Sequence, residues 1–269
     1  MVLKKSKIQM LNYPIINPTI FNLGPLQVRW YGVMYILGFT ASYFLVKYQI
    51  RKKRIDIDID LSDIFLYVML GLIIGARLGY IVFYNLPYYL DYPLKIFAVW
   101  EGGMSFHGGL IGAVLSGLMY LRKHKVNFWM FADLIIVTAP IGLGLGRLGN
   151  FLNAELYGRT TRLPWGMVFP NGGHLPRHPS QIYEIILEGI ILFLILWWLK
   201  DRKLKKGSLF CLFFILYSVF RFFIEFFREP DPQLGIIFFH ITMGQILSIF
   251  MGATGLALLY FIHRKREPL

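Results

Sequence analysis

Long apolar runs separated by short polar segments dominate the sequence. A helix must offer about 20 mostly apolar residues to cross the hydrocarbon core of a bilayer. The pattern therefore predicts an all-α fold, a polytopic membrane helix bundle that forms a single integral membrane domain over residues 1–269. Its transmembrane helices, about seven in number, are expected at roughly 29–48, 64–85, 104–121, 131–150, 182–199, 209–227 and 241–262.

Two polar stretches are expected to lie outside the hydrocarbon core. Residues 1–22 lack the long apolar segment and the small-residue cleavage site of a removable signal peptide. We expect them to form an interfacial segment on the outer surface of the membrane. Residues 151–181 separate two predicted spans and are expected to form an outer loop region.

Composition and charge both support a membrane protein. Hydrophobic residues make up 56% of the chain and charged residues 16%, whereas a soluble domain carries about 25% charged residues. The formal net charge of +13 could suggest a nucleic-acid partner. However, the basic clusters follow alternate spans. By the positive-inside rule, such clusters mark the loops that lie on the cytoplasmic side of the membrane. The N-terminus is therefore expected outside and the C-terminus in the cytoplasm, with anionic membrane lipid rather than nucleic acid as the basic residues' partner.

Ionisable residues inside predicted spans point to a functional site, because burying charge in a membrane is costly. Arg147 and Arg221 fall in the outer halves of their spans, and His107 and Tyr31 begin two other spans at a similar depth. Guanidinium groups bind phosphate bidentately and remain charged when desolvated. The arrangement predicts a site for a phospholipid phosphate. Arg77 is deeper, and for this residue a role in holding helices together is equally plausible.

Acidic and amide side chains accompany the two arginines. Glu225 lies between Arg221 and Arg228 on one helix face, and we expect it to orient both guanidinium groups. A run of four glycines surrounds Arg147, and three polar residues follow it: Asn150, Asn153 and Glu155. The glycines suggest close backbone approach to a lipid head group, with the polar residues reading its hydroxyls. The regularly spaced glycines at 71, 75 and 79 are instead expected to serve helix contact.

Metal and cysteine chemistry is not indicated. Cys211 is the only cysteine, so the chain can form no internal disulfide and no cysteine-based metal site. No spacing of His, Asp and Glu resembles a metal-binding motif. We therefore expect no metal ion at the site.

Several segments of the chain resemble one family of enzymes, the prolipoprotein diacylglyceryl transferases of bacterial inner membranes. The similarity extends from about residue 17 to residue 260, nearly the whole chain. Its longest signature, at 146–158, is mixed in residue type and so specific. The matching segments are Trp30-Tyr31-Gly32, His107-Gly108-Gly109, GRLGNFLNAELYG at 146–158, RHPSQIYE at 177–184 and RFFIEFFREPD at 221–231.

The resemblance implies a reaction, its substrates and a location. The family moves the diacylglyceryl unit of phosphatidylglycerol onto the lipobox cysteine thiol of a prolipoprotein, the first step of lipoprotein maturation. A thioether forms and glycerol phosphate is released. No cofactor is needed, and the partners are phosphatidylglycerol, the signal-peptide lipobox and inner-membrane lipids. The implied location is the inner membrane, multi-pass, with the N-terminus and the arm and head segments on the periplasmic side.

The resemblance also assigns candidate residues. Arg147 and Arg221 would hold the phosphate and stabilise its developing charge. His107 is the first candidate to accept the thiol proton; an orienting role for His107, with another group as the base, stays open. The substrate-binding candidates are Tyr31, Arg147, Asn150, Asn153, Glu155, Gly158, Tyr217, Glu225 and Arg228.

Other classes of protein would share some of these features. A transporter or channel also places arginines and glycine-rich helices in the membrane, although the chain has no detectable two-half repeat. A different phospholipid-modifying enzyme would form other products, and a structural scaffold would not depend on its arginines. Product analysis separates these alternatives.

Overall fold

The computed structural model describes residues 11–24, 26–99, 102–229, 236–238 and 241–264; at 23, 26, 106, 107 and 236–238 it describes the backbone alone. Two compact units can be distinguished. One comprises Met1–Val46 together with Ala132–Leu269, and the other comprises Lys47–Phe131. Each unit is described by itself below, the first as the larger unit and the second as the smaller unit.

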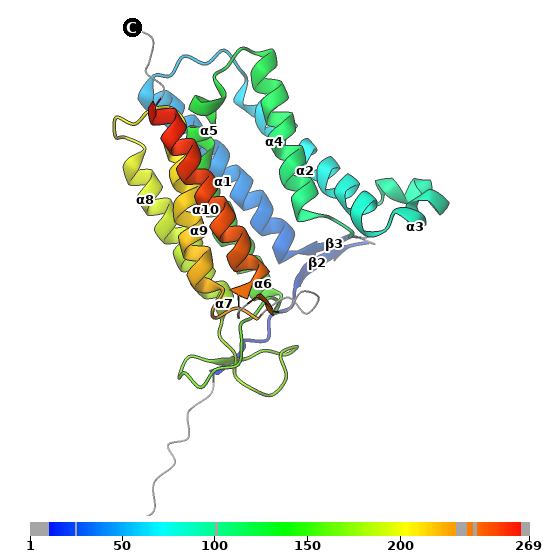
Figure 1. Cartoon of the computed structure of the whole chain (residues 1–269). Coiled ribbons are helices and arrows are strands. Elements are labelled where there is room, and N and C mark those ends of the chain that lie inside the picture. The colour runs from blue at the N-terminus through cyan, green and yellow to red at the C-terminus, as the bar shows by residue number, and fades with distance from the viewer. Residues whose placement is uncertain (1–10, 25, 100–101, 230–235, 239–240, 265–269) are drawn as a thin grey trace, which may run out of the picture. The chain divides into compact units, whose positions relative to one another are not determined.

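Helices that pack side by side make up most of the larger unit (Figure 1). α9 packs along α10, and α6 packs against η3. A small core of buried apolar side chains, including Val137, Leu192 and Leu209, joins the helices at α8 and α9. The helices of this unit are α1 (Trp30–Lys53, up to Val46), the end of α5 (Phe128–Ile136), α6 (Ala139–Leu152), α7 (Ser180–Glu184), η3 (Ile185–Ile191), α8 (Leu192–Leu199), α9 (Ser208–Ile224) and α10 (Met243–Arg264).

A π-helical segment, η3, lies in the middle of the continuous helix from α7 to α8. Wider π-helical turns are rare and often occur at functional sites. Gly189 in this segment faces Gly144 of α6, and a Cβ atom at Gly189 would lie only 2.9 Å from the Gly144 Cα. The two glycines therefore permit α6 and η3 to cross closely enough for side chains on either side of the crossing to meet.

Three two-stranded sheets accompany the helices, which the apolar pattern did not predict. β1 (Leu11–Asn12) pairs in parallel with β4 (Met167–Val168), and β2 (Thr19–Leu23) forms an antiparallel pair with β3 (Leu26–Arg29). β5 (Ile236–Phe238) pairs with β6 (Ile241–Thr242) directly before α10. Of the interfacial segment expected at 1–22, residues 1–10 lie outside the described residues. The β1–β4 pair ties its remainder to the loop expected at 151–181.

The smaller unit is built around two long helices, α2 (Leu61–Tyr84) and α4 (Phe106–Lys123), which lie side by side. A Cβ atom at Gly75 would lie 2.8 Å from the Cα of Gly112, and one at Gly79 would lie 2.8 Å from the Cα of Gly108. The prediction that the glycines at 71, 75 and 79 serve helix contact is confirmed. Two short helices, α3 (Leu86–Asp91) and η1 (Pro93–Phe97), connect α2 to the segment before α4.

Arg77 of α2 has a structural role in the smaller unit. Its side chain is buried, and its guanidinium lies over the ring of Tyr89 at 5.0 Å. A guanidinium offers five N–H donors in a planar fork, and here they satisfy the carbonyls of the connection between α2 and α4. The accepting carbonyl oxygens belong to Lys95, Ile96, Ala98, Gly102 and Gly103.

The described residues contain three helices that are long and apolar enough to cross a membrane: Leu61–Tyr84, Ser180–Leu199 and Met243–Arg264. A bent pair, α5 with α6, makes a fourth if it counts as one span. The protein is thus a helical membrane protein. All seven segments expected to span the membrane fall on helices, but the helix expected at 131–150 is wrong as a single element. The chain bends there by 42° between α5 and α6, just before Pro140, whose ring and missing N–H are accommodated only at the beginning of a helix.

Candidate active site

Ionisable side chains from three neighbouring helical segments meet inside the larger unit. They come from α6, from the junction of α7 with η3, and from the end of α9. Most are buried, in a part of the chain whose other side chains are mainly apolar. We call this group the charge network; its members are Arg147, Glu184, Glu188, Arg221, Glu225 and Arg228.

Glu184 joins the two arginines expected at the site. One of its carboxylate oxygens, Oε2, contacts Nε of Arg147. The other, Oε1, lies 3.4 Å from Nη1 of Arg221. The Glu184 side chain is 1% exposed, that of Arg221 is 9% exposed and that of Arg147 is 21% exposed. Two arginines from different helices therefore converge on one carboxylate, and Arg147 is the more accessible of the two.

Arg221 contacts three carboxylates in all. Besides Glu184, its Nη1 lies 3.7 Å from Oε1 of Glu188 and its Nη2 lies 3.0 Å from Oε2 of Glu225. The same Glu225 oxygen lies 3.8 Å from Nη1 of Arg228. The face predicted from the spacing of Arg221, Glu225 and Arg228 is therefore present, with the glutamate between the two arginines.

The beginning of α10 closes around Glu225. The hydroxyl of Thr242 donates a hydrogen bond of 3.1 Å to Glu225 Oε1. A Cβ atom at Gly244 would lie 2.6 Å from the carboxyl carbon of Glu225. A side chain at this position would displace the Glu225 carboxylate, which is held from both α9 and α10.

A chain of hydrogen bonds leads from Arg147 toward the exposed end of the site. Nη1 of Arg147 donates to Oδ1 of Asn150 at 3.4 Å. The amides of Asn150 and Asn153 donate to Oε1 of Glu155 at 2.9 and 3.2 Å. Gln181 donates to the backbone oxygen of Glu155 at 2.7 Å. Glu155 is exposed, so the chain connects the buried network to the surface.

Two tyrosines predicted to bind substrate lie beside the network. The ring of Tyr31 packs closely on Gly149. A Cβ atom added at Gly149 would lie 2.9 Å from that ring. Tyr31 is within electrostatic reach of Arg147 and Glu155. Tyr217 lies one helical turn before Arg221 on α9, and its ring stacks on that of Phe213 with a centroid separation of 5.7 Å.

The loop expected at 151–181 is fastened to the segment that follows α9 at Gly158. The Gly158 amide donates to the His178 carbonyl at 2.8 Å, and the next amide, that of Arg159, donates to the Phe227 carbonyl at 2.9 Å. A Cβ atom at Gly158 would lie 2.7 Å from the Cβ of His178. Packing thus explains the glycine at this position. Burial lowers the pKa of His178, whose ring contacts Tyr183 and Phe227.

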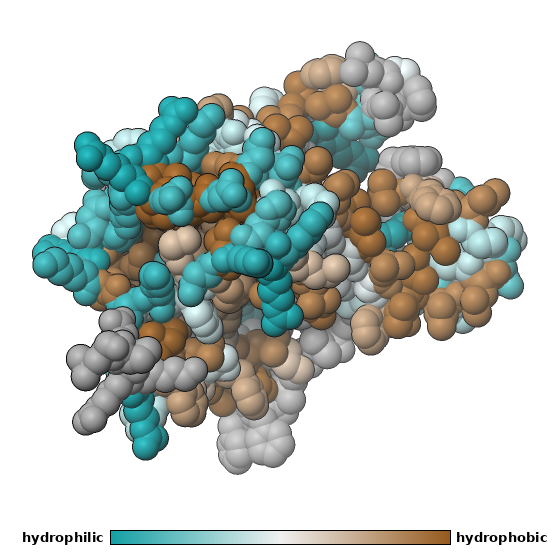
Figure 2. Space-filling view, turned by 90° about the horizontal axis from the view of Figure 1, so that it is seen from above, coloured by the Kyte–Doolittle hydropathy of each residue, from teal (hydrophilic) through white to brown (hydrophobic). Residues whose placement is uncertain are grey.

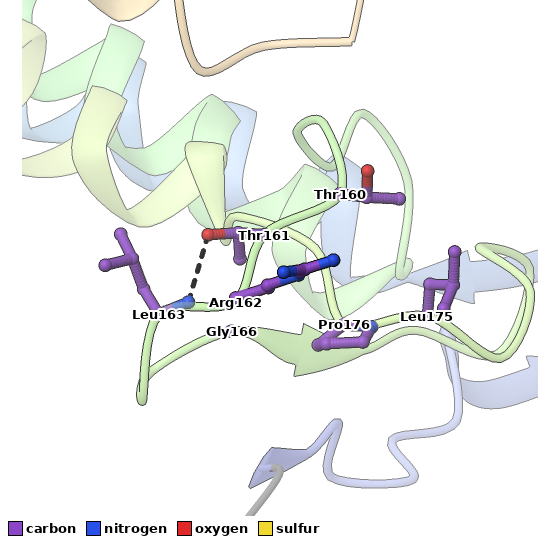
Figure 3. A pocket seen from close by; sticks show the side chains of 7 residues that line it. All are labelled: Thr160, Thr161, Arg162, Leu163, Gly166, Leu175 and Pro176. Carbon is purple, nitrogen blue, oxygen red and sulfur yellow. Dashed lines mark hydrogen bonds between the residues drawn. The ribbon is translucent and has the colours of Figure 1, made fainter. Parts of the chain in front are cut away.

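Next to this junction the same loop lines an open cavity of about 430 Å³. Figure 3 shows its lining, in which the Arg162 side chain extends between Thr160 and Pro176. Thr161 accepts a hydrogen bond of 3.2 Å from the Leu163 amide. The cavity belongs to the outer loop and does not contain the members of the charge network.

The glycines around Arg147 serve two purposes. Gly144 and Gly149 lie where α6 crosses η3 and the beginning of α1, and an added Cβ would lie 3.2 Å from the Gly189 Cα at the first and 2.9 Å from the Tyr31 ring at the second. An added Cβ at Gly142 or Gly146 would meet no atom within 4 Å, but a Cβ added at Gly38 of α1 would lie 3.2 Å from the Gly142 Cα. Helix contact therefore accounts for three of the four glycines, and close approach to a lipid head group remains the explanation only for Gly146.

His107 lies in the first turn of α4, in the smaller unit. Its side chain is outside the described residues. The neighbouring Gly108 and Gly109 have no room for side chains because they pack on α2. The structure therefore explains these two glycines by helix contact and leaves the role of His107 a prediction.

Glu184 and Glu188 were not predicted as site residues, although both belong to the network. Each is a carboxylic acid inside the predicted span 182–199, so the criterion that selected the arginines would also have found them. Thr242 and Gly244 carry a weaker signal, as polar and small residues at the start of a span. Among the described residues, no group of three or more His, Cys, Asp or Glu side chains is placed to hold a metal ion.

Comparisons with known proteins show the family to which the chain belongs. A family model described as "Prolipoprotein diacylglyceryl transferase" matches residues 18–261. Three similar proteins are named phosphatidylglycerol–prolipoprotein diacylglyceryl transferase. The one from Desulfotalea psychrophila is 52% identical over 262 residues, covering 94% of this chain and 96% of that protein. Those from Geobacter sulfurreducens and Coxiella burnetii are 51% and 47% identical, covering 95% and 96% of this chain and 99% and 100% of their own lengths.

Proposed function

Because the chain belongs to the prolipoprotein diacylglyceryl transferase family, we propose that its charge network holds the phosphate of phosphatidylglycerol during the transfer. The enzyme moves the diacylglyceryl group of phosphatidylglycerol to a prolipoprotein. The observation that carries the site assignment is the convergence of Arg147 and Arg221 on one carboxylate. Two guanidinium groups that share a carboxylate can also share a phosphate, because both anions present a pair of charged acceptor oxygens.

Arg147 is the arginine that contacts the phosphate. Its Nε is engaged by Glu184 and its Nη1 by Asn150, while its Nη2 makes no hydrogen bond or ion pair with any described residue. Nη2 therefore has donors for a ligand oxygen. Arg221 is more deeply buried and held by three carboxylates, so it contributes a fixed positive charge close to the leaving group.

In the reaction the cysteine sulfur forms a bond to the glyceryl carbon next to the phosphate, and the bond from that carbon to the phosphate oxygen breaks. The leaving group is glycerol phosphate, which gains a negative charge as the bond breaks. Preorganised guanidinium groups stabilise that charge without reorganising. The result is a thioether between the lipid and the cysteine.

The thiol must lose its proton before or during attack, since its ordinary pKa is about 8.5 and the thiolate is the nucleophile. His107 is the proposed proton acceptor. Tyr31 and Tyr217 position the lipid head group or the peptide. Asn150 and Asn153 present amides toward the exposed end of the site, where the glycerol hydroxyls of the head group would be read.

We also propose seven spans with the N-terminus outside. Support comes from the larger unit, where Lys205 donates a hydrogen bond to the His263 carbonyl at 3.3 Å. The basic cluster at 200–206 and Arg264 therefore lie at the same end of that unit. Figure 2 views this end, over which hydrophilic side chains gather. The network and Glu155 belong to the opposite end, where the proposal places the outer leaflet.

Product analysis tests this function. The purified protein is incubated with phosphatidylglycerol and a lipobox peptide carrying either cysteine or serine. The cysteine peptide alone should gain the mass of a diacylglyceryl group, with one glycerol phosphate released for each peptide modified. Gain of a single acyl chain, or equal modification of the serine peptide, would contradict the reaction.

A matched pair of variants tests the site. Arg147→Met removes the phosphate contact, and the expected loss in kcat is about 10²–10³-fold, as for other preorganised donors. Arg162→Met removes an exposed arginine of the outer loop and should retain transfer. An Arg147→Met protein that inserts and turns over at the normal rate would defeat the assignment. A normal rate for His107→Gln would eliminate His107 as the base.

A further inference from the structure

Glu188 is a buried acid for which the proposed mechanism has no use. It lies in η3 with a fully buried side chain. Neither of its carboxyl oxygens takes part in a hydrogen bond with any described residue. Its nearest cationic atom is Nη1 of Arg221 at 3.7 Å, and Glu184 lies closer to that same nitrogen, at 3.4 Å.

The charges of the network balance only if every carboxyl is ionised. The network contains three arginines and three glutamates: Arg147, Arg221, Arg228, Glu184, Glu188 and Glu225. With all six ionised the sum is zero, and a phosphate would add an uncompensated negative charge. Such a charge is costly in a water-poor interior. A network built to hold a phosphodiester needs one net positive charge.

The geometry distinguishes which carboxyl can be neutral. Glu184 is paired with both Arg147 and Arg221. Glu225 has Arg221 at 3.0 Å and a hydrogen bond from Thr242. The ion pairs of Glu188 are limited to one nitrogen, Nη1 of Arg221, which Glu184 also contacts. Desolvation disfavours the charged form of a carboxyl unless a cation or hydrogen bonds offset it, and at Glu188 the offset is weakest.

We propose that Glu188 carries a proton when the enzyme binds lipid, so that the three arginines retain one positive charge for the phosphate of phosphatidylglycerol. This rests on the proposed function. Glu188 acts through Arg221 and is a positioning residue, because its contact is to the arginine. Ionisation of Glu188 would neutralise the network and weaken lipid binding.

Proton linkage follows from this assignment. Below the pH at which Glu188 ionises in the free enzyme, lipid binds without exchange of protons. Above it, binding requires Glu188 to take up one proton, and the affinity falls about tenfold per pH unit. The other groups that act electrostatically on Glu188 are Glu184, Arg147, Arg221, Arg228 and Tyr217. Arginine and tyrosine side chains ordinarily keep their protons well above neutral pH, and Glu184 is paired with two guanidinium groups.

The test is binding of phosphatidylglycerol to the full-length enzyme in detergent without peptide, so that thiol ionisation plays no part. Calorimetric titration in two buffers of different ionisation enthalpy gives the number of protons taken up. The wild-type enzyme should take up no proton at the acidic end of its stable range and close to one at the basic end. Binding of phosphatidylglycerol that is independent of pH, without proton uptake, would overturn the proposal.

Two variants test whether Glu188 is the group that takes up the proton. Glu188→Gln, which cannot ionise, should abolish the proton uptake and the basic loss of affinity. Glu229→Gln removes a carboxylate paired with Arg177 outside the network and should leave both effects as in the wild type. Persistence of proton uptake in Glu188→Gln would also overturn the proposal. The wild-type titration can do so even if this variant does not fold.

Failure of the proposed function gives a different result. If phosphatidylglycerol binds no more tightly than zwitterionic phosphatidylcholine at any pH, the arginine site itself is wrong. Preferential binding of phosphatidylglycerol without proton linkage overturns only the role of Glu188.

Discussion

The two arginines that converge on Glu184 should differ in what their loss does to the stability of the protein. Replacing either by methionine removes the charge while keeping an unbranched side chain of similar length. Arg221→Met removes a cation from three carboxylates, Glu184, Glu188 and Glu225. Arg147→Met removes one that contacts Glu184 and Asn150.

The structure gives the magnitudes. Removing one partner of a buried ion pair costs about 3–5 kcal/mol, and Arg221, at 9% exposure, meets that description. After loss of Arg147, Glu184 keeps Arg221 at 3.4 Å, and Asn150 keeps its bond to Glu155. The cost there is that of an imperfectly satisfied polar group, about 1–3 kcal/mol. The expected difference in the free energy of unfolding is therefore about 2 kcal/mol.

The assay is unfolding of the purified variants in mixed micelles, titrated with denaturing detergent at neutral pH. Arg162→Met serves as the control, since Arg162 is exposed on the outer loop. Mild acid should restore part of the stability of Arg221→Met, because the carboxyls left without a cation can then be protonated. Equal losses for the two variants, or a larger loss for Arg147→Met, would refute the network geometry.

Three further predictions concern other parts of the molecule. Arg77→Lys cannot reach all five carbonyls, and each one left without a donor should cost about 1–3 kcal/mol of stability; no loss in detergent unfolding would refute its structural role. Gly158→Ala should lower stability and transfer together because a Cβ atom would press on His178; normal thermal stability would count against this. Burial lowers the pKa of His178 in the folded protein. As the pH falls below about 6.5, His178 therefore gains a proton in the unfolded chain before it does so in the folded protein. The native state should therefore lose stability on acidification, and His178→Gln should lose less than the wild type over the same pH range.

The helices could be predicted because a long apolar run is itself what a membrane-spanning helix requires. The bend between α5 and α6 had a local signal in Pro140, whereas the short strands had none. The pair of Leu11 with Met167 depends on residues far apart in the sequence, and strands of two to five residues are too short for an alternating pattern to be recognised.

Single residues of the site could be predicted, because a charged residue within an apolar span is costly and therefore stands out in the sequence. That cost selects Arg147 and Arg221, and applied to acids it would also select Glu184 and Glu188. Which carboxylate meets which guanidinium depends on the π-helical turn in η3 and on the close crossing at Gly189, and neither follows from spacing in an ordinary helix. For Gly158, packing against His178 and the Phe227 carbonyl supplies one reason for the glycine, and its part in substrate binding stays a prediction.

The central claim is that Arg147 grips the phosphate of phosphatidylglycerol. Nitrogen–phosphorus dipolar coupling between arginine side chains and the lipid phosphate measures this contact directly in isotope-labelled enzyme. A coupling should be present in the wild-type protein with bound phosphatidylglycerol and should fall sharply in Arg147→Met, while Arg162→Met retains it. A coupling of undiminished strength in Arg147→Met would contradict the account.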